Sequence, residues 1–289
     1  MKKSTQIRAT LASTNSVSSI AHILENIASI RITQIKDEVL QSRDFFSRLW
    51  SMYGQLRVSD KDARANLATT ATIAANAQSN KKAVILITAN AGLTGEVDTI
   101  LINQVLAEVD PKTTDFFVLG MHGQSLLLQH NINPIKTLRF PEVGQAIDVS
   151  DLMQALVPYS TPTVYYPSYD SLSIQRVFSL ELKSTVQKLG AQDRNLNQEE
   201  IIFKDNCIFE PSVVEVVAYL EQMMMSTILT EIILESNLAQ LSSRFNAMNV
   251  ASSKATDMAK NLQRRYVQLR RYESDESNRR YSNSRKATV

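Results

Sequence analysis

The chain has 289 residues, 44% of them hydrophobic, and a formal net charge of +2. This length allows one or two domains with proper cores, and the near-neutral charge argues against a protein that binds polyanions along its whole length. The single cysteine, Cys207, excludes an internal disulfide and a cysteine metal cluster.

The distribution of glycine and proline divides the chain into three parts. All seven glycines and all seven prolines lie between Gly54 and Pro211. Because both residues interrupt helices, we expect the two ends to be helical and the middle to consist of shorter elements. The expected boundaries are 1–58 for an N-terminal helix, 80–207 for a central α/β domain, and 212–289 for a C-terminal helix with a polar, basic tail.

The N-terminal segment begins MKKSTQIRATLAST, which lacks the apolar run of a secretory signal, so no signal peptide is expected. Farther along, apolar residues recur every three or four positions and predict one apolar helix face. This face consists of Ile20, Ile23, Leu24, Ile27 and Ile30, and it continues with Ile35 and Val39.

The central region alternates between two kinds of pattern. Residues 81–90 form an apolar run of strand length, and residues 91–109 place apolar side chains at helical spacing. Such alternation predicts a small, mostly parallel sheet covered by helices, in a Rossmann-like arrangement. Further strands are predicted over 115–123, 161–171 and 177–184, and a further helix over 148–158.

We predict no catalytic, metal-binding or cofactor-binding residue in this region. The turn NAGLTGEVD (90–98) contains Gly92 and Gly95, but it lacks the GK[ST] ending of a phosphate loop and the third glycine of a dinucleotide site. It is therefore expected to be a tight turn, with a Rossmann-like nucleotide binder as the alternative. His122 lies between Gly120 and Gly123 and is expected to be a surface histidine on a turn.

The C-terminal segment carries one long apolar stripe whose members lie three or four residues apart, a spacing typical of a left-handed coiled coil. Even 50 helical residues span roughly 75 Å, whereas a globular domain of this size is about 40–50 Å across, so we expect the helix to project beyond its own domain. An antiparallel pair with the N-terminal helix is favoured, and a helical bundle around the middle is the alternative. The stripe consists of Leu234, Leu238, Leu241, Phe245, Met248, Ala251, Ala255, Met258, Leu262, Tyr266 and Leu269.

Basic residues gather near the C-terminus. From Arg264 to the end there are eight basic residues and three acidic ones. This cluster suits an acidic protein partner, and a third hypothesis is a coiled-coil adaptor or a nucleic-acid binder that works through it. The stretch after about residue 272 has almost no apolar face, and both a helix and a disordered tail are compatible with it.

Several short motifs are shared, in the same order, with one known family. The segment FEPSVVEVVAYL (209–220) matches an E-P-S-x-x-E signature, and RFNAM (244–248) matches R-M-x-A-M. The matching positions are Ile7, Arg8, Ile20, Thr88, Gly92, Leu93, Gly95, Gly120, Gly123, Glu210, Pro211, Ser212, Glu215, Arg244, Ala247, Met248, Tyr266 and Arg270. By these motifs the chain resembles the gamma subunit of F-type ATP synthase, although its arginine-rich C-terminus departs from that family.

The resemblance implies a central rotor shaft without catalytic activity of its own. The two terminal helices would form an antiparallel coiled coil inside a ring of alternating alpha and beta subunits. The α/β domain would contact the epsilon subunit and the membrane c-ring, whose proton-driven rotation would turn the shaft and cycle the beta subunits. The resemblance implies no cofactor, nucleic acid or small-molecule substrate, and a peripheral location on the cytoplasmic face of a bacterial plasma membrane.

Two sets of residues follow from this interpretation. Residues expected at the contact between the two helices are Ile20, Leu24, Ile27, Leu238, Leu241, Phe245, Met248 and Leu262. Residues expected to contact the surrounding ring or the stator are Arg8, Arg244, Lys254, Arg270 and Arg271.

Overall fold

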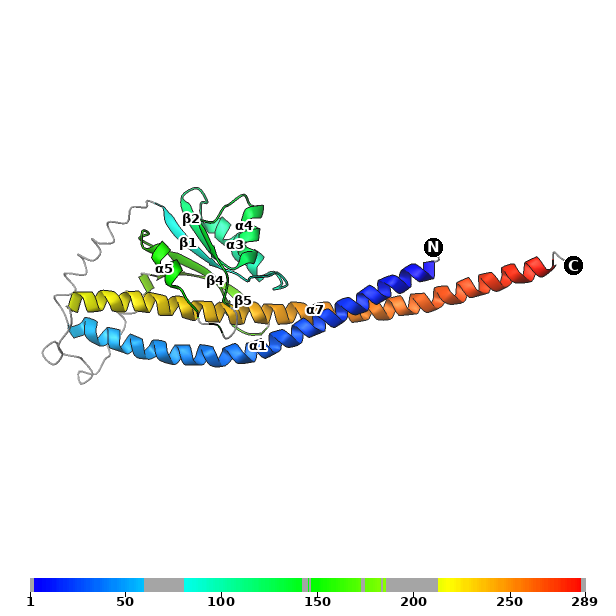
Figure 1. Cartoon of the computed structure of the whole chain (residues 1–289), viewed down its shortest axis with the longest axis horizontal. Helices are drawn as coiled ribbons and strands as arrows, with labels where there is room; N and C mark the ends of the chain where they lie inside the picture. The colour runs from blue at the N-terminus through cyan, green and yellow to red at the C-terminus, as the bar shows by residue number, and fades with distance from the viewer. Residues whose placement is uncertain are drawn as a thin grey trace. The chain divides into compact units, whose positions relative to one another are not determined.

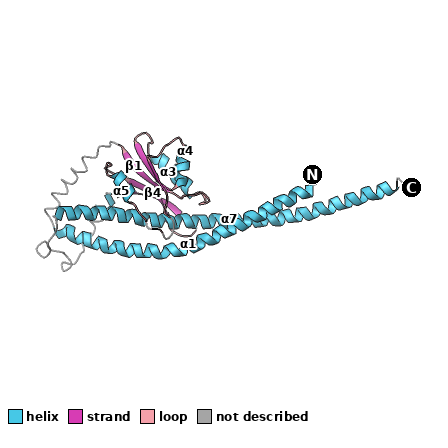
Figure 2. Ribbon diagram, in the orientation of Figure 1, coloured by secondary structure: helices cyan, strands magenta, loops and turns pink. Residues whose placement is uncertain are grey.

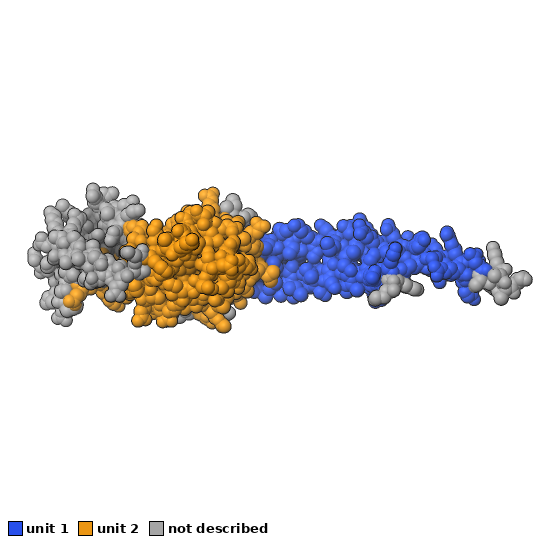
Figure 3. Space-filling view, turned by 90° about the horizontal axis from the view of Figure 1, so that it is seen from above, with its two compact units in different colours: residues 1–29, 244–289 blue, residues 30–243 orange. Residues whose placement is uncertain are grey.

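The computed structural model describes residues 3–59, 81–141, 145, 147–172, 175–182, 184–185 and 213–286. The E-P-S part of the signature at 210–212 lies outside these residues, as does Cys207. Two compact units are present, one formed by Met1–Ser29 with Arg244–Val289 and the other by Ile30–Ser243 (Figure 3). Each unit is described by itself below.

The unit formed by Ile30–Ser243 contains a five-stranded sheet with the order β3-β2-β1-β4-β5. Figure 2 shows its strands in magenta. The pairs β1–β2, β2–β3 and β1–β4 are parallel, and β5 is antiparallel to β4. This topology confirms the predicted mostly parallel sheet. The strands are β1 (Lys82–Ile87), β2 (Thr114–Leu119), β3 (Lys136–Leu138), β4 (Thr163–Tyr169) and β5 (Gln175–Glu181).

Helices cover both faces of this sheet, which explains why its central strands read as continuous apolar runs. On one face, Leu86 and Phe116 pack with Leu101 of α3 (Val97–Glu108) and Leu127 of α4 (Met121–Gln129). On the other face, the strands pack against α5 (Ser150–Leu156) and against the segment of α7 that contains Ile228–Ile233. One face of the sheet therefore rests directly on a long helix from the far end of the chain.

The two longest helices are α1 (Lys3–Ser59) and α7 (Val213–Lys286), shown in blue and in yellow to red in Figure 1. In the unit Ile30–Ser243, Ile35 and Val39 of α1 pack against Leu234, Leu238 and Leu241 of α7. The colours of Figure 1 show that the chain runs along these two helix segments in opposite directions, so they are antiparallel. The helical state of residues 273–286 answers the question that the polar sequence after residue 272 leaves open.

Two elements differ from the sequence-based expectation. Helix α4 occupies residues expected to form a turn, and the short strand β3 was not predicted. Helix α4 begins directly after Gly120, and β3 follows a loop that contains Pro134. The sequence pattern indicates both residues only as breaks. In the described part of the chain, no helix combines the length and the apolar character that crossing a bilayer requires.

Candidate interaction surface of the paired helices

Polar contacts join the two helices of the unit formed by Met1–Ser29 with Arg244–Val289. The amide and hydroxyl of Ser4 donate to the carboxylate of Glu273, at 3.1 and 2.6 Å. Farther along, the hydroxyls of Ser18 and Thr256 lie 3.0 Å apart. These contacts define an antiparallel register in which the start of α1 lies beside residue 273 of α7.

The contact line of α1, which we call the α1 seam, repeats with steps of three and four residues, as in a coiled coil. Within this unit its most buried members are small, since Thr14, Ala21 and Ala28 are 9%, 5% and 1% exposed. Small side chains allow two helix backbones to approach closely. The α1 seam consists of Ser4, Ile7, Leu11, Thr14, Ser18, Ala21, Glu25, Ala28, Ile32, Ile35 and Val39, all buried or half-buried.

This seam corrects part of the expected contact set. Ile20 and Ile27 were expected at the helix contact, but they are 57% and 42% exposed. At 100° per residue, their side chains point roughly a third of a turn away from the α1 seam. Leu24, which lies between the two faces, is half-buried. The physical reason is that small side chains occupy the contact in this part of α1, whereas the prediction from the sequence pattern relied on the large apolar side chains.

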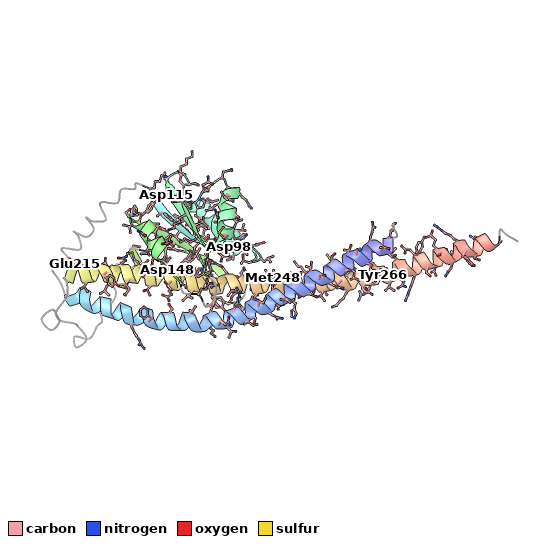
Figure 4. The ribbon with its side chains drawn as sticks, in the orientation of Figure 1. Asp98, Asp115, Asp148, Glu215, Met248 and Tyr266 are labelled. Atoms are coloured by element: carbon pink, nitrogen blue, oxygen red, sulfur yellow. The ribbon has the colours of Figure 1, made fainter. Side chains whose placement is uncertain are left out.

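The α7 side of the helix contact agrees more closely with its predicted stripe. Leu238, Leu241 and Met248 are buried, and Phe245 and Leu262 are half-buried. Met248 and Tyr266 both lie on α7, as Figure 4 shows. Met258, however, is 57% exposed, and the half-buried residue at this level is its neighbour Ala259. As on α1, the alanine occupies the contact and the longer side chain points outward.

An exposed row of aliphatic side chains follows the outside of α1. We call the residues Val17, Ile20, Ile23, Ile27 and Ile30 the aliphatic row. Their exposed fractions lie between 42% and 61%. Isolated exposed apolar residues are common, but a continuous row at helical spacing marks a surface that a partner covers.

The basic residues predicted to contact a ring or stator divide into two groups. Arg8, Lys254, Arg270 and Arg271 are exposed. Arg244 is half-buried and its Nε atom is buried. The first four are therefore available to a partner, whereas Arg244 is engaged within the chain itself.

A buried polar cluster ties the carboxyl end of β1 to α7, in the unit Ile30–Ser243. The hydroxyl of Ser243 donates to the carbonyl oxygen of Thr94 at 2.6 Å. In the same loop, Oδ2 of Asp98 accepts from the Thr94 hydroxyl at 3.3 Å and from the Ala89 amide at 3.4 Å. Asp98 is fully buried at the start of α3 (Figure 4).

His122 completes this cluster. Its Nδ1 lies 2.7 Å from Oδ2 of Asp98, and its side chain is 25% exposed, so the prediction of a surface histidine on a turn is wrong. The hydrogen bond to Asp98 raises the pKa of His122, against the opposing effect of burial, and the charge of Asp98 raises it further. The second oxygen of Asp98, Oδ1, is buried without a hydrogen-bond partner among the described residues.

The two glycines around His122 explain why a helix follows where a turn was expected. Gly120 has φ +113°, and a Cβ there would lie 2.1 Å from the carbonyl oxygen of Thr88. A Cβ on Gly123 would lie 2.3 Å from the Thr88 hydroxyl, which accepts a hydrogen bond from the Gly123 amide. Both glycines let α4 start directly against β1 and thereby place His122 over Asp98.

This geometry disfavours an anion at the turn 90–98. A phosphate at the N-terminus of α3 would need the free backbone amides there and would lie beside a buried carboxylate. Asp98 already accepts from one backbone amide of this loop. In addition, no group of three or more potential metal ligands occurs among the residues that the structure describes. The role of the cluster is therefore structural: its hydrogen bonds connect the loop after β1 to α4 and to α7.

Comparison with known proteins decides the family. A sequence model of the family described as ATP synthase matches residues 3–273. The chain belongs to the ATP synthase family. Within this family it corresponds to the gamma chain, a non-catalytic stalk subunit of the membrane-associated F1 portion.

Curated relatives in the ATP synthase family support the same assignment. The ATP synthase gamma chain of Mycoplasmoides gallisepticum is 22% identical over 259 residues, covering 87% of this chain and 88% of the relative. The ATP synthase gamma chain of Elusimicrobium minutum is 25% identical over 280 residues, covering 91% of each. These similarities extend over the helices and the α/β region together.

Solved structures show the same fold at low sequence identity. A chain of the Euglena gracilis mitochondrial ATP synthase, from a structure of OSCP, F1 and the c-ring, superposes with a TM-score of 0.64 and 14% identity, covering 98% of this chain and 94% of that chain. A chain from the central stalk and c-ring of the Tetrahymena thermophila enzyme gives a TM-score of 0.55 and 14% identity, covering 81% and 99%. This ATP synthase family member therefore shares the fold of chains from rotor structures.

Proposed function

We propose that this chain is the central rotor shaft of an F-type ATP synthase or ATPase. The helix pair of α1 and α7 stands inside a ring of alternating alpha and beta subunits, and the α/β unit contacts the epsilon subunit and the membrane c-ring. The complex lies on the cytoplasmic face of a bacterial plasma membrane. Rotation of the c-ring turns the shaft, and the shaft moves the beta subunits through their catalytic states.

The observation that carries this proposal is the aliphatic row. Each of its side chains remains about half exposed in the isolated chain, so covering the row would contribute about 1 kcal/mol per residue. The helix contact itself does not need these residues, because the α1 seam and the inward face of α7 fill it. A ring of subunits around the helix pair supplies the cover that such a surface requires.

The exposed basic residues suit a contact that must form and release. Arg8, Lys254, Arg270 and Arg271 lie on the outside of the pair. Exposed ion pairs contribute only about 0–1 kcal/mol each and weaken as salt concentration rises. Several weak contacts transmit force to the beta subunits without locking the shaft in one orientation.

The test replaces Ile20, Ile23 and Ile27 together by alanine in the tagged full-length chain. Alanine keeps the helix, and the helix contact is untouched, so the thermal unfolding temperature of the chain should stay close to that of the wild type. Co-purification of alpha and beta subunits should fall severalfold. The control replaces the exposed Asn15 of the same helix by alanine and should leave co-purification unchanged.

The outcome that contradicts the proposal is full recovery of alpha and beta subunits with the triple variant. A wild-type chain that purifies without either subunit would contradict it more directly. Robust ATP hydrolysis by the isolated chain would also count against a non-catalytic shaft.

A further inference from the structure

The loop that connects β1 to α3 has a strained backbone conformation. Leu93 has φ +67°, in the left-handed region that residues other than glycine rarely adopt. Its side chain is 62% exposed, so apolar packing within the chain does not hold it in this conformation. Such backbone strain persists only where contacts of the surrounding residues impose it. We call residues 91–96 the β1–α3 flap.

Thr94 holds the flap against the rest of the fold. It is fully buried, and its carbonyl oxygen accepts a hydrogen bond from the Ser243 hydroxyl of α7 at 2.6 Å. Its own hydroxyl donates to Oδ2 of Asp98 at 3.3 Å. Gly92 and Gly95 flank this part of the flap, and glycine adopts both signs of φ without strain. The flap can therefore change its backbone conformation at these two glycines once Thr94 is released.

Both ends of the flap are fixed. At one end, the side chain of Asn90 donates to the Phe140 carbonyl and accepts from the Phe140 amide, both at 2.7 Å. At the other end, Val97 is buried and begins α3. A movement of the flap therefore leaves β1 and α3 in place and is a local opening, distinct from unfolding of the sheet.

The closed flap buries a carboxylate that has few hydrogen-bond donors. Asp98 is fully buried, and its Oδ1 has no partner among the described residues. The amide of Ala89 and the hydroxyl of Thr94 reach Oδ2 only at 3.4 and 3.3 Å, whereas Nδ1 of His122 lies 2.7 Å away. A buried charged group with unfilled acceptor positions is costly, and water would fill them. Withdrawal of Thr94 would hydrate Asp98, so the closed flap depends on His122 for its stability.

The charge of His122 decides how well the closed flap tolerates this carboxylate. Neutral His122 can donate one hydrogen bond to Asp98, but only the protonated ring also compensates its charge. The hydrogen bond to Asp98 raises the pKa of His122, burial opposes this effect, and the charge of Asp98 raises the pKa further. The titratable groups next in sequence to these contacts are Glu96, which is exposed on the flap, and Arg244, which follows Ser243 on α7 and is half-buried.

We propose that the β1–α3 flap is a pH-sensitive switch, closed while His122 is protonated and open more often when His122 is neutral. Opening releases Thr94 from Asp98 and from Ser243, so the loop after β1 loses this link to α7. The closing effect of the charge is complete below about pH 6.5 and is lost as pH rises through the raised pKa of His122. This inference concerns the chain itself and does not rest on the proposed rotor function.

Hydrogen exchange of the full-length chain, followed by mass spectrometry, tests the switch. Exchange of peptides that cover the flap is measured at about pH 6 and about pH 8.5 and divided by the intrinsic exchange rate at each pH, which gives a protection factor. We expect the protection of the flap to fall severalfold between the lower and the higher pH. Equal protection of the wild-type flap at the two pH values would overturn the proposal.

Two variants affect the switch in opposite directions. His122→Gln keeps a hydrogen-bond donor but cannot be protonated, so its flap should show at the lower pH the weak protection that the wild type shows at the higher pH. Asp98→Asn removes the buried charge, so its flap should stay equally protected at both pH values. His130→Gln replaces an exposed histidine at the end of α4 and, as the matched control, should keep the wild-type pH dependence. A wild-type pH dependence in the His122→Gln variant would contradict the switch.

Urea distinguishes opening of the flap from unfolding of the whole unit. A local opening exposes little surface, so the protection of the flap should hardly change in about 1 M urea, whereas the protection of β1 should fall. Retained protection of β1 without urea also shows that each variant is folded. If the protection of the flap and of β1 fell together in urea, the flap would not move independently and the proposal would be wrong.

Discussion

At the residue scale, the pair of Asp98 and His122 is the feature with the most direct physical consequence. Asp98 is fully buried, and its Oδ1 has no hydrogen-bond partner among the described residues, so its charge depends on His122 for compensation. The pKa of His122 is raised above 6.5 because Asp98 accepts its hydrogen bond. The ion pair thus contributes its full stabilisation below about pH 6.5, and this contribution is lost as pH rises through the raised pKa.

We therefore expect replacement of His122 by glutamine to lower the free energy of unfolding by about 2 kcal/mol at pH 6, because a hydrogen bond to a charged group is lost. The difference from wild type should shrink as pH rises above the pKa of His122. Thermal or urea unfolding of the wild-type chain and the variant across pH 5.5–8.5 measures this difference in unfolding free energy. In the matched variant Asp98→Asn, the pKa of His122 should return toward 6.5 in an NMR titration. A pH-independent difference would contradict the assignment of a charged pair.

Ser243 gives a second prediction at this scale. Its buried hydroxyl donates the hydrogen bond that joins α7 to the loop after β1. Replacement by alanine leaves the carbonyl of Thr94 without this donor, and we expect a loss of about 1–2 kcal/mol of unfolding free energy. Replacement of the exposed Ser253 by alanine on the same helix should cost much less. Equal stability of the two variants would show that the Ser243 bond does not hold the loop.

At the element scale, the contact between α1 and α7 depends on small side chains. Ala28 is 1% exposed, whereas its neighbour Ile27 is 42% exposed. Replacing Ala28 by leucine should force the helices apart and cost about 1–3 kcal/mol, while replacing Ile27 by alanine should change the free energy of unfolding by much less. Chemical unfolding of the two full-length variants compares them. A tolerated leucine at Ala28 would mean that the helices do not approach closely there.

The same pair of neighbours shows how far the sequence predicts these elements. Apolar runs located four of the five strands, and the distribution of glycine and proline predicted helices at both ends. Large apolar residues, however, led to Ile20 and Ile27 as contact residues, because a hydropathy pattern does not show which apolar face lies against a partner. On α7 the large residues face inward: Leu238 and Leu241 pack with Ile35 and Val39 of α1, and Met248 is buried.

The polar cluster was missed for a different reason. Asp98 and His122 are 24 positions apart, and only the parallel pairing of β1 with β2 brings the ends of these strands together. Gly120 and Gly123 were available as a signal, but they indicate a break in the pattern and not the close contact with Thr88 that they permit. A pair formed by tertiary structure leaves no local pattern of its own.

At the scale of the whole molecule, the chain transmits motion and leaves catalysis to its neighbours. The helix contact uses small residues, the aliphatic row and the basic residues remain for a surrounding ring, and the polar cluster fixes the sheet to α7. Each of these features suits a rotor that must keep its own fold while its contacts with the surrounding subunits change.

The most direct test of this account is rotation of this chain within its own complex. The ring of alpha and beta subunits is immobilised, the native Cys207 is replaced, and a bead is attached to a single cysteine introduced at the exposed Lys112. During ATP hydrolysis, the account predicts continuous rotation of the bead in one direction, which stops when ATP is exhausted. A bead that stays stationary while the same complexes hydrolyse ATP would contradict it.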